Sequence, residues 1–377
     1  MKCAQFIWNP FAGWDNSVDD ANKNADLVMV FGSIDSIGEP EHVRDLRLMF
    51  PKAQLIFAST AGEISGRRVL NGFIVATAIQ LEKTKVKCVS LDYNKYTSSE
   101  DCGAEISQML KGDKLCHIFV LSDGISVNGD DLVKGLRENA SAETVITGGL
   151  AGDMGRFSAT LVGLNEVPTQ NKIVAVGFYG DNFKVNYGSK GGWDEFGPSR
   201  TVTKSKGNVL YELDDQPALD LYKKYLGSKA ADLPSSALLF PLKVQINLGE
   251  EPLVRTILAI DESNGSMTFA GDIPQGSNVK FMMADYDHLI DGAARAAEKS
   301  GKQSEISPEL VIMVSCVGRK LVLGDRVDEE VEAVADRLGK EAIYTGFYSN
   351  GEISPLVSKS DCRLHNQTMT ITAYAEF

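Results

Sequence analysis

The stretch that decides the fold is Ala53-Gln54-Leu55-Ile56-Phe57-Ala58-Ser59-Thr60-Ala61-Gly62-Glu63-Ile64-Ser65, in which a short apolar strand runs into a glycine–acid pair. A helical pattern over residues 40–50 precedes it, and another apolar strand, Leu27-Val28-Met29-Val30-Phe31-Gly32-Ser33, precedes that helix. Short apolar runs that alternate with helical patterns are typical of parallel β-α-β segments. We therefore predict a β-α-β unit that closes with a turn at Gly62 and Glu63.

The same order of elements occurs twice more along the chain. The second copy has strands at 117–124 and 144–146, a helix at 129–138 and a turn at 148–153; the third has strands at 311–316 and 342–344, a helix at 328–338 and a turn at 346–354. Further strands follow the three turns at 72–79, 157–164 and 364–374. These added strands predict mixed sheets. The turn glycines suit positive φ or close backbone approach, and the acids either orient a loop or face a pocket.

Two domains are expected, both α/β with mixed sheets built from repeated β-α-β-turn-β units. The second copy continues into two extra strands at 172–179 and 183–190, followed by a polar, glycine-rich stretch and a helix at 217–226. Residues 228–236 have the composition of a boundary, so we place one domain at 1–227 and the other at 228–377. Beyond the boundary, Asn264-Gly265 between two apolar runs predicts a β-hairpin.

Composition excludes several classes of function. The 377 residues include 38 Lys and Arg against 51 Asp and Glu, a net charge of −13, which disfavours binding to nucleic acid or to an anionic membrane. No apolar run approaches the roughly 18 residues of a spanning helix, and the N-terminus lacks a signal-peptide pattern. The six cysteines are scattered without a Cys-x-x-Cys pair, so neither a disulfide framework nor a structural zinc site is expected. We expect a cytoplasmic protein.

Longer motifs extend through both halves of the chain. They are Ser59–Ile64, Gly148–Phe157, Gly192–Pro198, Gly207–Leu213, Cys316–Arg319, Gly346–Ile353 and Leu364–Thr370. In this order they resemble the FIST family, a pair of intracellular sensory domains called FIST N and FIST C. The resemblance covers about residues 25 to 375.

The resemblance implies a ligand sensor in signal transduction. Many family members are fused to kinase, cyclic-nucleotide or chemotaxis output domains, whereas the two sensory domains use all 377 residues here. We therefore expect the chain to act through a partner such as a sensor histidine kinase, with homo-oligomer formation left open. Some stand-alone bacterial members bind haem, sense nitric oxide and modulate a histidine kinase. A haem-based nitric oxide sensor is the leading hypothesis, and a sensor of a small polar metabolite such as an amino acid, without haem, is the alternative.

The histidines limit where a haem could be held, because haem requires one axial donor and an apolar pocket. His365 lies in one of the motifs that resemble the family and is our first candidate for the axial ligand. Its alternative role is to hold the Gly351-Glu352 turn together with Asn366 by local hydrogen bonds. His288 is the second candidate, because the dipole at a helix N-terminus disfavours its cationic form and suits a neutral ligand. A histidine in this position is more often simply solvated.

Two further histidines are not candidates. His42 lies between charged residues of a helical pattern and is predicted at the surface. His117 alternates with apolar neighbours and is predicted in the core.

Several other side chains could contact a ligand. Arg319 could clamp a carboxylate or a haem propionate, or it could form a salt bridge with Glu352. Trp193, Phe347 and Tyr348 could line an apolar pocket or pack in a core. In the metabolite alternative, Arg319 and the turn carboxylates hold the charged groups of the ligand.

Catalysis is not expected. Ser59 and Thr60 are nucleophile types, but the sequence has no Gly-x-Ser-x-Gly elbow and no recognisable His/Asp partner arrangement for them. No Walker or dinucleotide-binding glycine pattern is present either. The chain is therefore predicted to be a sensor and not an enzyme.

Overall fold

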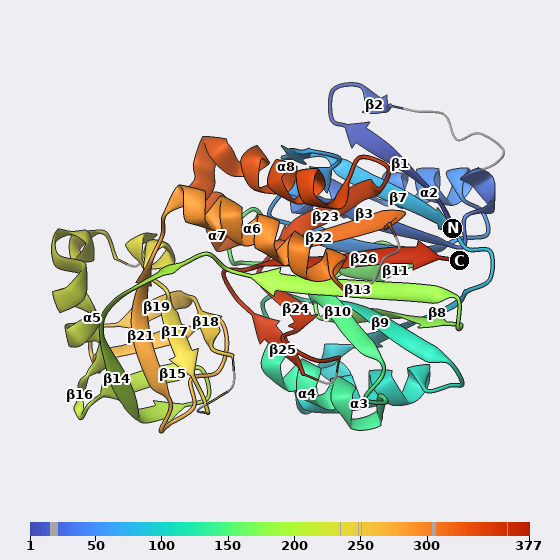
Figure 1. Cartoon of the computed structure of the whole chain (residues 1–377). Helices are drawn as coiled ribbons and strands as arrows, with labels where there is room; N and C mark the ends of the chain where they lie inside the picture. Colours follow the sequence, from blue (N-terminus) through green and yellow to red (C-terminus); the bar gives the residue numbers. More distant parts are fainter. Residues whose placement is uncertain (16–21, 234, 248, 250, 304–306, 360) are drawn as a thin grey trace.

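The computed structural model describes residues 1–15, 22–233, 235–247, 249, 251–303, 307–359 and 361–377. Figure 1 shows a large body, which holds most of the sheets and helices, and a smaller lobe that contains helix α5. The body consists of three similar units. None of the helices in the described ranges is both long and apolar enough to cross a membrane.

The first unit is a mixed sheet in the order β11-β4-β3-β7-β1-β2. Its own elements are β1 (Lys2–Asn9), β2 (Gly13–Trp14), β3 (Leu27–Ser33), α1 (Ile34–Ile37), α2 (Pro40–Met49), β4 (Gln54–Thr60) and β7 (Ile74–Gln80). Strands β3 and β4 are parallel, and β7 and β1 are antiparallel to their neighbours. Helix α2 begins with Pro40 in its first turn, where a missing N–H costs nothing, and Leu46 packs it on one face of the sheet.

The second unit repeats this arrangement in the order β25-β24-β10-β9-β12-β8. Its own elements are β8 (Lys85–Asp92), α3 (Ser99–Leu110), β9 (Leu115–Ser122), α4 (Gly129–Asn139), β10 (Val145–Leu150) and β12 (Lys172–Tyr179). Strands β9 and β10 are the parallel pair. Gly103 and Gly135 let helices α3 and α4 approach closely, because a Cβ atom on either glycine would fall within 2.3 Å of the backbone of the other helix.

The third unit has the order β13-β26-β22-β23-β5-β6. Its own elements are β13 (Phe183–Lys190), α6 (Tyr286–Gly301), β22 (Leu310–Cys316), α7 (Val317–Leu323), α8 (Val327–Leu338), β23 (Ile343–Ser349) and β26 (Met369–Glu376). Strands β22 and β23 are parallel, and α6 and α8 share a cluster of small and β-branched apolar side chains with the sheet.

The three units exchange strands in a closed cycle. After its glycine–acid turn, each unit sends a strand to the sheet of another unit, where that strand pairs with the second parallel strand. Unit one sends β5 (Glu63–Ser65) and β6 (Arg68–Leu70) to β23, unit two sends β11 (Val162–Leu164) to β4, and unit three sends β24 (Gly351–Pro355) and β25 (Cys362–His365) to β10. A common core with buried Phe31, Leu121 and Val314 lies where the three sheets meet. No unit can therefore leave the body without breaking sheet hydrogen bonds.

The lobe is an insertion into the third unit, between β13 and α6. It contains β14 (Asp194–Lys206), β15 (Val209–Leu213), β16 (Gln216–Pro217), α5 (Ala218–Leu226), β17 (Leu242–Gln245), β18 (Leu253–Arg255), β19 (Ile257–Asp261), β20 (Ser266–Phe269) and β21 (Asn278–Met283). Its own apolar cluster joins α5 to these strands and includes Tyr222 and Phe281. The hairpin predicted at Asn264-Gly265 is confirmed, with Asp261 opposite Ser266 and Gly265 at φ +67°.

The mixed-sheet α/β class and the repeated units are confirmed, but one strand was assigned to the wrong unit. Strand β13 belongs to the third sheet, not to the second. It follows β12 after a tight turn, and the rings of Phe178 and Phe183 stack at 4.9 Å across two different sheets. The boundary expected between 227 and 228 lies inside the lobe, directly after α5.

Candidate functional site

The three glycine–acid turns occupy equivalent positions at the ends of β4, β10 and β23. Their carboxylates, on Glu63, Asp153 and Glu352, are fully buried. In two turns, the hydroxyl three residues earlier donates to the acid: Thr60 Oγ1 to Glu63 at 2.6 Å, and Ser349 Oγ to Glu352 at 2.9 Å. The turns are thus a structural repeat as well as a sequence repeat.

Two of these carboxylates, on Glu63 and Glu352, hold a loop farther along the chain, and Asp153 holds the residues that follow it at 157–159. Glu63 accepts the main-chain N–H of Phe73 at 3.2 Å, and Glu352 accepts both the N–H and the hydroxyl of Thr368, at 3.2 and 2.8 Å. Burial raises the pKa of Glu63 to about 7 and that of Glu352 to about 8, although these hydrogen bonds oppose the shift. Their observed contacts are those of loop anchors.

Arg319 makes its ion pair and its hydrogen bonds within the body. It forms a buried ion pair with Glu330, with 2.6 Å between Nη2 and Oε2. It also donates to the main-chain oxygens of Gly191 and Leu289, which lie on the chain segments that leave for the lobe and return from it. The ion pair considered with Glu352 is therefore made with Glu330 instead.

Phe347 and Tyr348 are also buried in the body. The ring of Phe347 packs on Phe31 in the common core, with 4.7 Å between the ring centroids. The hydroxyl of Tyr348 donates to Glu330 at 2.6 Å, so it belongs to the same buried network as Arg319. Both side chains have the packing role that was the alternative to lining a pocket.

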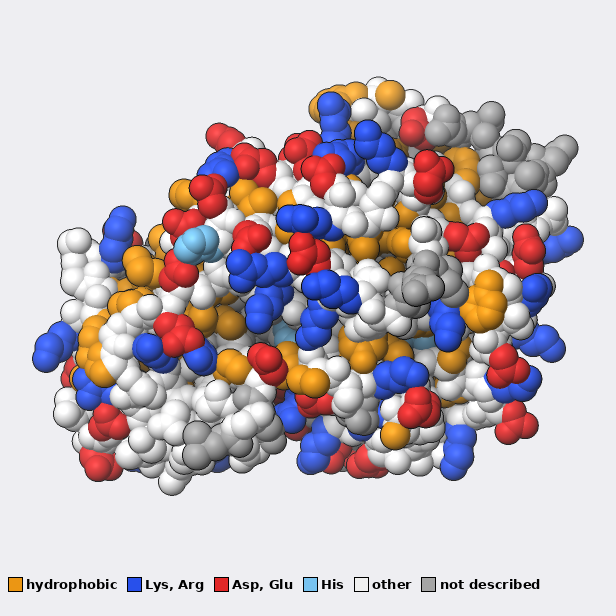
Figure 2. Space-filling model, in the orientation of Figure 1, with side chains coloured by type: hydrophobic (Ala, Val, Ile, Leu, Met, Phe, Trp, Pro, Cys, Tyr) orange, Lys and Arg blue, Asp and Glu red, His pale blue; other side chains and the backbone are white. Residues whose placement is uncertain are grey.

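A cleft of about 770 Å³ lies between the lobe and the body, and we call it the basic cleft. It is lined by Ser189, Lys190, Gly191, Gly192, Trp193, Glu195, Lys243, Glu251, Pro252, Leu253, Val254, Met282, Arg295, Glu298, Lys299, Lys302, Leu356, His365 and Thr368. Figure 2 shows Lys and Arg side chains gathered in the middle of this face, where the lobe meets the body. The cleft brings together two of the expected residues, His365 and Trp193.

His365 is 3% exposed at the wall of this cleft. Its Nε2 lies 3.0 Å from the main-chain oxygen of Ser354, which can only accept, so Nε2 carries the proton and Nδ1 keeps a lone pair. Burial lowers the pKa of His365 to about 4, so the ring is neutral at pH 7. Trp193 Nε1 donates to the main-chain oxygen of Gln367 at 2.8 Å, which fixes the indole at the cleft wall.

Lysines dominate the unpaired charge of the cleft. Lys243 pairs with Glu195, Arg295 with Asp291, and Glu298 with Arg337. Three lysines, Lys190, Lys299 and Lys302, then remain opposite a single acid, Glu251. Within the described ranges, neither Lys190 nor Lys302 makes an ion pair, and Lys299 donates to the main-chain oxygen of Leu356.

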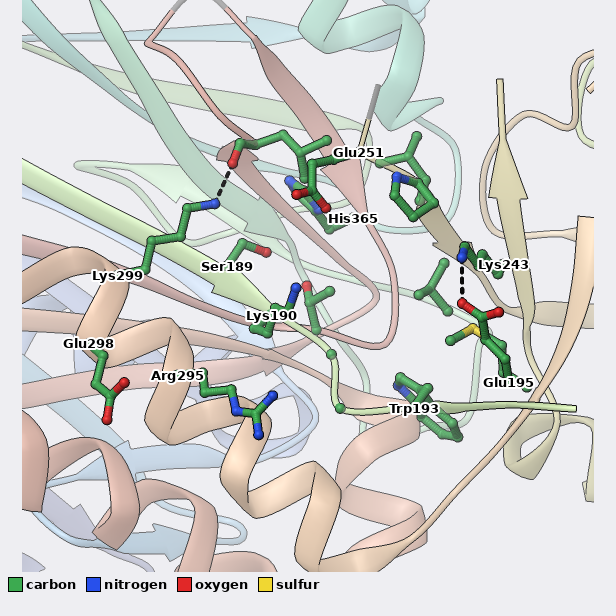
Figure 3. A pocket seen from close by; sticks show the side chains of 18 of the residues that line it. Ser189, Lys190, Trp193, Glu195, Lys243, Glu251, Arg295, Glu298, Lys299 and His365 are labelled. Atoms are coloured by element: carbon green, nitrogen blue, oxygen red, sulfur yellow. Dashed lines mark hydrogen bonds and ion pairs between the residues drawn. The ribbon is translucent and has the colours of Figure 1, made fainter. Parts of the chain in front are cut away.

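A buried hydroxyl lies among these lysines. Ser189 Oγ has no hydrogen-bond partner in the described part of the chain. Figure 3 shows Ser189 between Lys299, Lys190 and His365. The arrangement can therefore offer cations, a hydroxyl and a neutral imidazole to one small molecule.

Two other residues predicted to contact a ligand, Asn366 and His288, also do not line the basic cleft. Asn366 is fully buried beside His365 in the chain, and neither polar atom of its side chain has a partner in the described residues. His288 is solvent-exposed at the start of α6, where its Nδ1 pairs with Asp194 at 2.8 Å, and that carboxylate raises its pKa.

Ser189 and the lysines were not among the residues predicted to contact a ligand. A signal for part of this set was present, because Arg295, Lys299 and Lys302 are spaced i, i+4 and i+7 and so share one face of α6. The prediction for His42 was wrong: it is buried against Trp8, with 4.3 Å between the ring centroids. His117 is in the core, as predicted, and its Nε2 lies 2.7 Å from the hydroxyl of Tyr374.

Comparisons with known proteins identify the family. The FIST N domain matches residues 26–216, and the FIST C domain matches residues 218–355. No curated protein matches the chain. A crystal structure of cyanuric acid hydrolase from A. caulinodans is similar over 78% of this chain and 99% of that chain, at 12% identity and a TM-score of 0.19, which is too low to carry an argument. With both domain models matching in order, the chain belongs to the FIST family of sensory domains.

Proposed function

We propose that this chain is a sensor that binds a small anionic or zwitterionic metabolite, such as an amino acid, in the basic cleft. The observation that carries the proposal is the group of Lys190, Lys299 and Lys302 opposite one carboxylate. The chain as a whole has a net charge of −13, so this local excess of cations runs against the general charge of the protein. A cleft of this polarity attracts anions.

The other groups of the cleft suit a zwitterion. The Ser189 hydroxyl and the Nδ1 lone pair of His365 can accept from an ammonium group, and Glu251 supplies a counter-charge. The carboxylate of the ligand would then face Lys190 and Lys302. Trp193 adds an apolar wall for a side chain.

Binding here would report to a partner through the lobe. Lobe residues such as Lys243 and Leu253 form one wall of the cleft, and body residues such as His365 and Lys299 form the other. A ligand that contacts both walls binds more tightly when they are close, so it shifts the population of lobe positions. We propose that a separate signalling protein, for instance a sensor histidine kinase, reads this shift in the cytoplasm.

We propose binding without turnover, because the hydroxyl groups of Ser59 and Thr60 already make hydrogen bonds within the body. Ser59 Oγ donates to the main-chain oxygen of Gly152 at 2.7 Å and accepts from the N–H of Leu161 at 2.8 Å. Thr60 Oγ1 donates to Glu63. Both hydroxyls are thus engaged in structural hydrogen bonds.

A thermal-shift panel tests the metabolite proposal. We expect at least one amino acid or small carboxylate at millimolar concentration to raise the melting temperature of the wild type, because a ligand that binds only the folded state stabilises it. Lys190→Met should lose the shift. Lys52→Met, which removes an exposed lysine far from the cleft, should keep it. A shift that is equal in all three proteins would contradict the proposed site.

Haem is the second candidate, and it is favoured by one observation, the lone pair on Nδ1 of buried His365. The residues that would hold such a group are His365 as the donor to the iron, Trp193 and Met282 as apolar contacts, and Lys190 and Lys302 as partners of its carboxylates. When bound, ferrous haem would supply the affinity for nitric oxide. His365 would orient the group, and the apolar side chains would exclude water from it.

An absorption spectrum separates the two candidates. The protein is incubated with haem, reduced and exposed to nitric oxide. A Soret band that responds to nitric oxide, and that is lost in His365→Ala but kept in His288→Ala, would support haem. A protein that takes up no haem, or the same spectrum in both variants, would rule out haem at His365.

A further inference from the structure

A second cavity lies between the lobe and the body, and we call it the apolar pocket. Its volume is about 640 Å³. The body side is formed where β9, β10 and β23 end and α4 begins, and the lobe side is formed near β19 and β20. The lining residues are Gly124, Ile125, Ser126, Val127, Asn128, Gly129, Leu150, Phe157, Asn208, Leu238, Ile257, Leu258, Phe269, Ala270, Gly271 and Asn350. In contrast to the basic cleft, none of them carries a charge.

Exposed apolar side chains gather at this pocket. Ile125 is 43% exposed, Phe157 39% and Leu258 44%, and all three line the same cavity. Single exposed apolar residues are ordinary on a protein surface, whereas a group of them around a concave site marks a place of binding. Two of them belong to the body and one to the lobe, so an occupant would contact both.

The backbone is strained where it supplies one of these side chains. Phe157 has φ +52°, a conformation that an aromatic residue rarely adopts and that costs about 1–2 kcal/mol. The carboxylate of Asp153 enforces it, because it accepts three main-chain N–H groups in a row, from Phe157, Ser158 and Ala159. The result is an aromatic ring held 39% exposed at the pocket.

The hydrogen bonds around the pocket indicate which polar groups a ligand needs. Several main-chain N–H groups near it are already used: Thr160 accepts that of Gly124, Asp123 accepts those of residues 125 and 126, and Asn128 accepts those of residues 130 and 131. Asn128 therefore caps the start of α4.

One buried side-chain acceptor at the pocket has no donor within the ranges that the structure describes. Asn350 Oδ1 is buried without a partner among the described residues, and it is the one such side-chain atom in the lining. Its orientation is set by Nδ2, which points to the main-chain oxygen of Gly124 at 3.4 Å, because the flipped amide would place two oxygens against each other. A buried acceptor without a donor costs about 1–3 kcal/mol, so a ligand gains by supplying the donor.

We propose that the apolar pocket is a second ligand site, which takes an uncharged, planar aromatic molecule with at least one N–H or O–H donor. The rings of Phe157 and Phe269 and the aliphatic side chains receive the planar body, and Asn350 accepts from the donor. The site is separate from the basic cleft. The buried ion pair of Arg255 with Asp130, at 2.9 Å, lies against Gly271 at the wall of the pocket and offers it no net charge.

Calorimetric titration of the full chain with indole and 1-methylindole tests the proposal, because the two probes share the planar body and differ in the N–H donor. Indole should bind to the wild type, and 1-methylindole should bind at least about fivefold more weakly, since it leaves Asn350 without a donor. Leu258→Trp should fill the pocket and abolish indole binding. Leu258 is largely exposed, so this change is compatible with folding, which a melting curve checks.

Leu48→Trp is the matched control, because Leu48 is an exposed leucine on α2, outside the lining of both cavities. It should bind indole as the wild type does. Equal affinity for the two probes would overturn the role of Asn350. Indole binding that survives Leu258→Trp, or that is absent from the wild type, would overturn the site.

Discussion

The body and the lobe of this molecule are built in opposite ways. The body consists of three units that exchange strands, so each sheet contains backbone from two units, and one core joins all three. The lobe is a single insertion with its own core, connected to the body through two chain segments, polar contacts such as that of Arg255 with Asp130, and a small apolar cluster in which Met282 of the lobe packs with Leu289 of α6. The repeated turns, which drew attention in the sequence, hold the body together. Both cavities lie instead at the interface between lobe and body, which we call the seam.

This difference explains why the seam suits sensing. An interlocked body resists local opening, because opening it breaks sheet hydrogen bonds, whereas movement of the lobe breaks only the contacts between lobe and body. Ligands that contact both sides of the seam therefore have a movable wall to act on.

Arg319→Met should cause the largest loss of stability, about 3–5 kcal/mol, because it leaves Glu330 buried without its partner and releases both segments that lead to the lobe. Chemical denaturation measures the loss. Arg337→Met is the control, because Arg337 forms an exposed ion pair with Glu298, and it should cost less than about 1 kcal/mol. Similar losses for the two variants would contradict the role given to Arg319.

Arg255→Met should loosen the lobe while the body stays folded. Arg255 is a buried lobe residue that pairs with Asp130 of α4 at 2.9 Å and donates to the main-chain oxygen of Leu364 at 3.0 Å. Losing these contacts should cost about 2 kcal/mol. Limited proteolysis should then cut the lobe faster than the body, and uniform cleavage of both regions would argue against a separable lobe.

Glu352→Gln tests a turn of the body through pH. Burial raises the pKa of Glu352 to about 8 from an ordinary 4.5, so the folded state binds more protons than the unfolded state between these values. The wild type should therefore lose stability as pH rises through this window. The variant has no proton to lose there, so its stability relative to the wild type should improve steadily as pH rises from 5 to 8. Parallel pH profiles would contradict the raised pKa.

His365→Gln tests the seam in the opposite pH direction and should give the smallest effect. Burial lowers the pKa of His365 to about 4, so the unfolded state takes up a proton first as pH falls below 6.5. The wild type should lose stability as pH falls from 6.5 to 4, and the variant, whose side chain takes up no proton, should lose less over that range. Urea denaturation at a series of pH values measures the difference.

Much of the body could be predicted from sequence, because local patterns specify it. The helices α2, α4 and α8 and the parallel strands follow from apolar periodicity and from the recurring turns. The exchange of strands between units could not be predicted in this way, since adjacency in the chain is a poor guide to pairing. Strand β13 shows this: it follows β12 closely but pairs with β26, almost 190 residues later.

The candidate site was only partly predictable for a related reason. His365 and Trp193 were found through motifs, whereas Ser189 and Lys190 lie at the end of a strand and become a site only because the lobe and α6 meet there. Arg319 and Tyr348 were proposed as ligand contacts because their chemistry fits that role. Both side chains instead donate to Glu330, a buried acid eleven residues after Arg319.

The most direct test of the account is native mass spectrometry of the full chain after incubation with a mixture of amino acids and small carboxylates. We expect a one-to-one complex in the wild type and in Lys52→Met, and its loss in Lys190→Met. A complex that is equally abundant in all three proteins, or absent from the wild type, would contradict a charged ligand in the basic cleft.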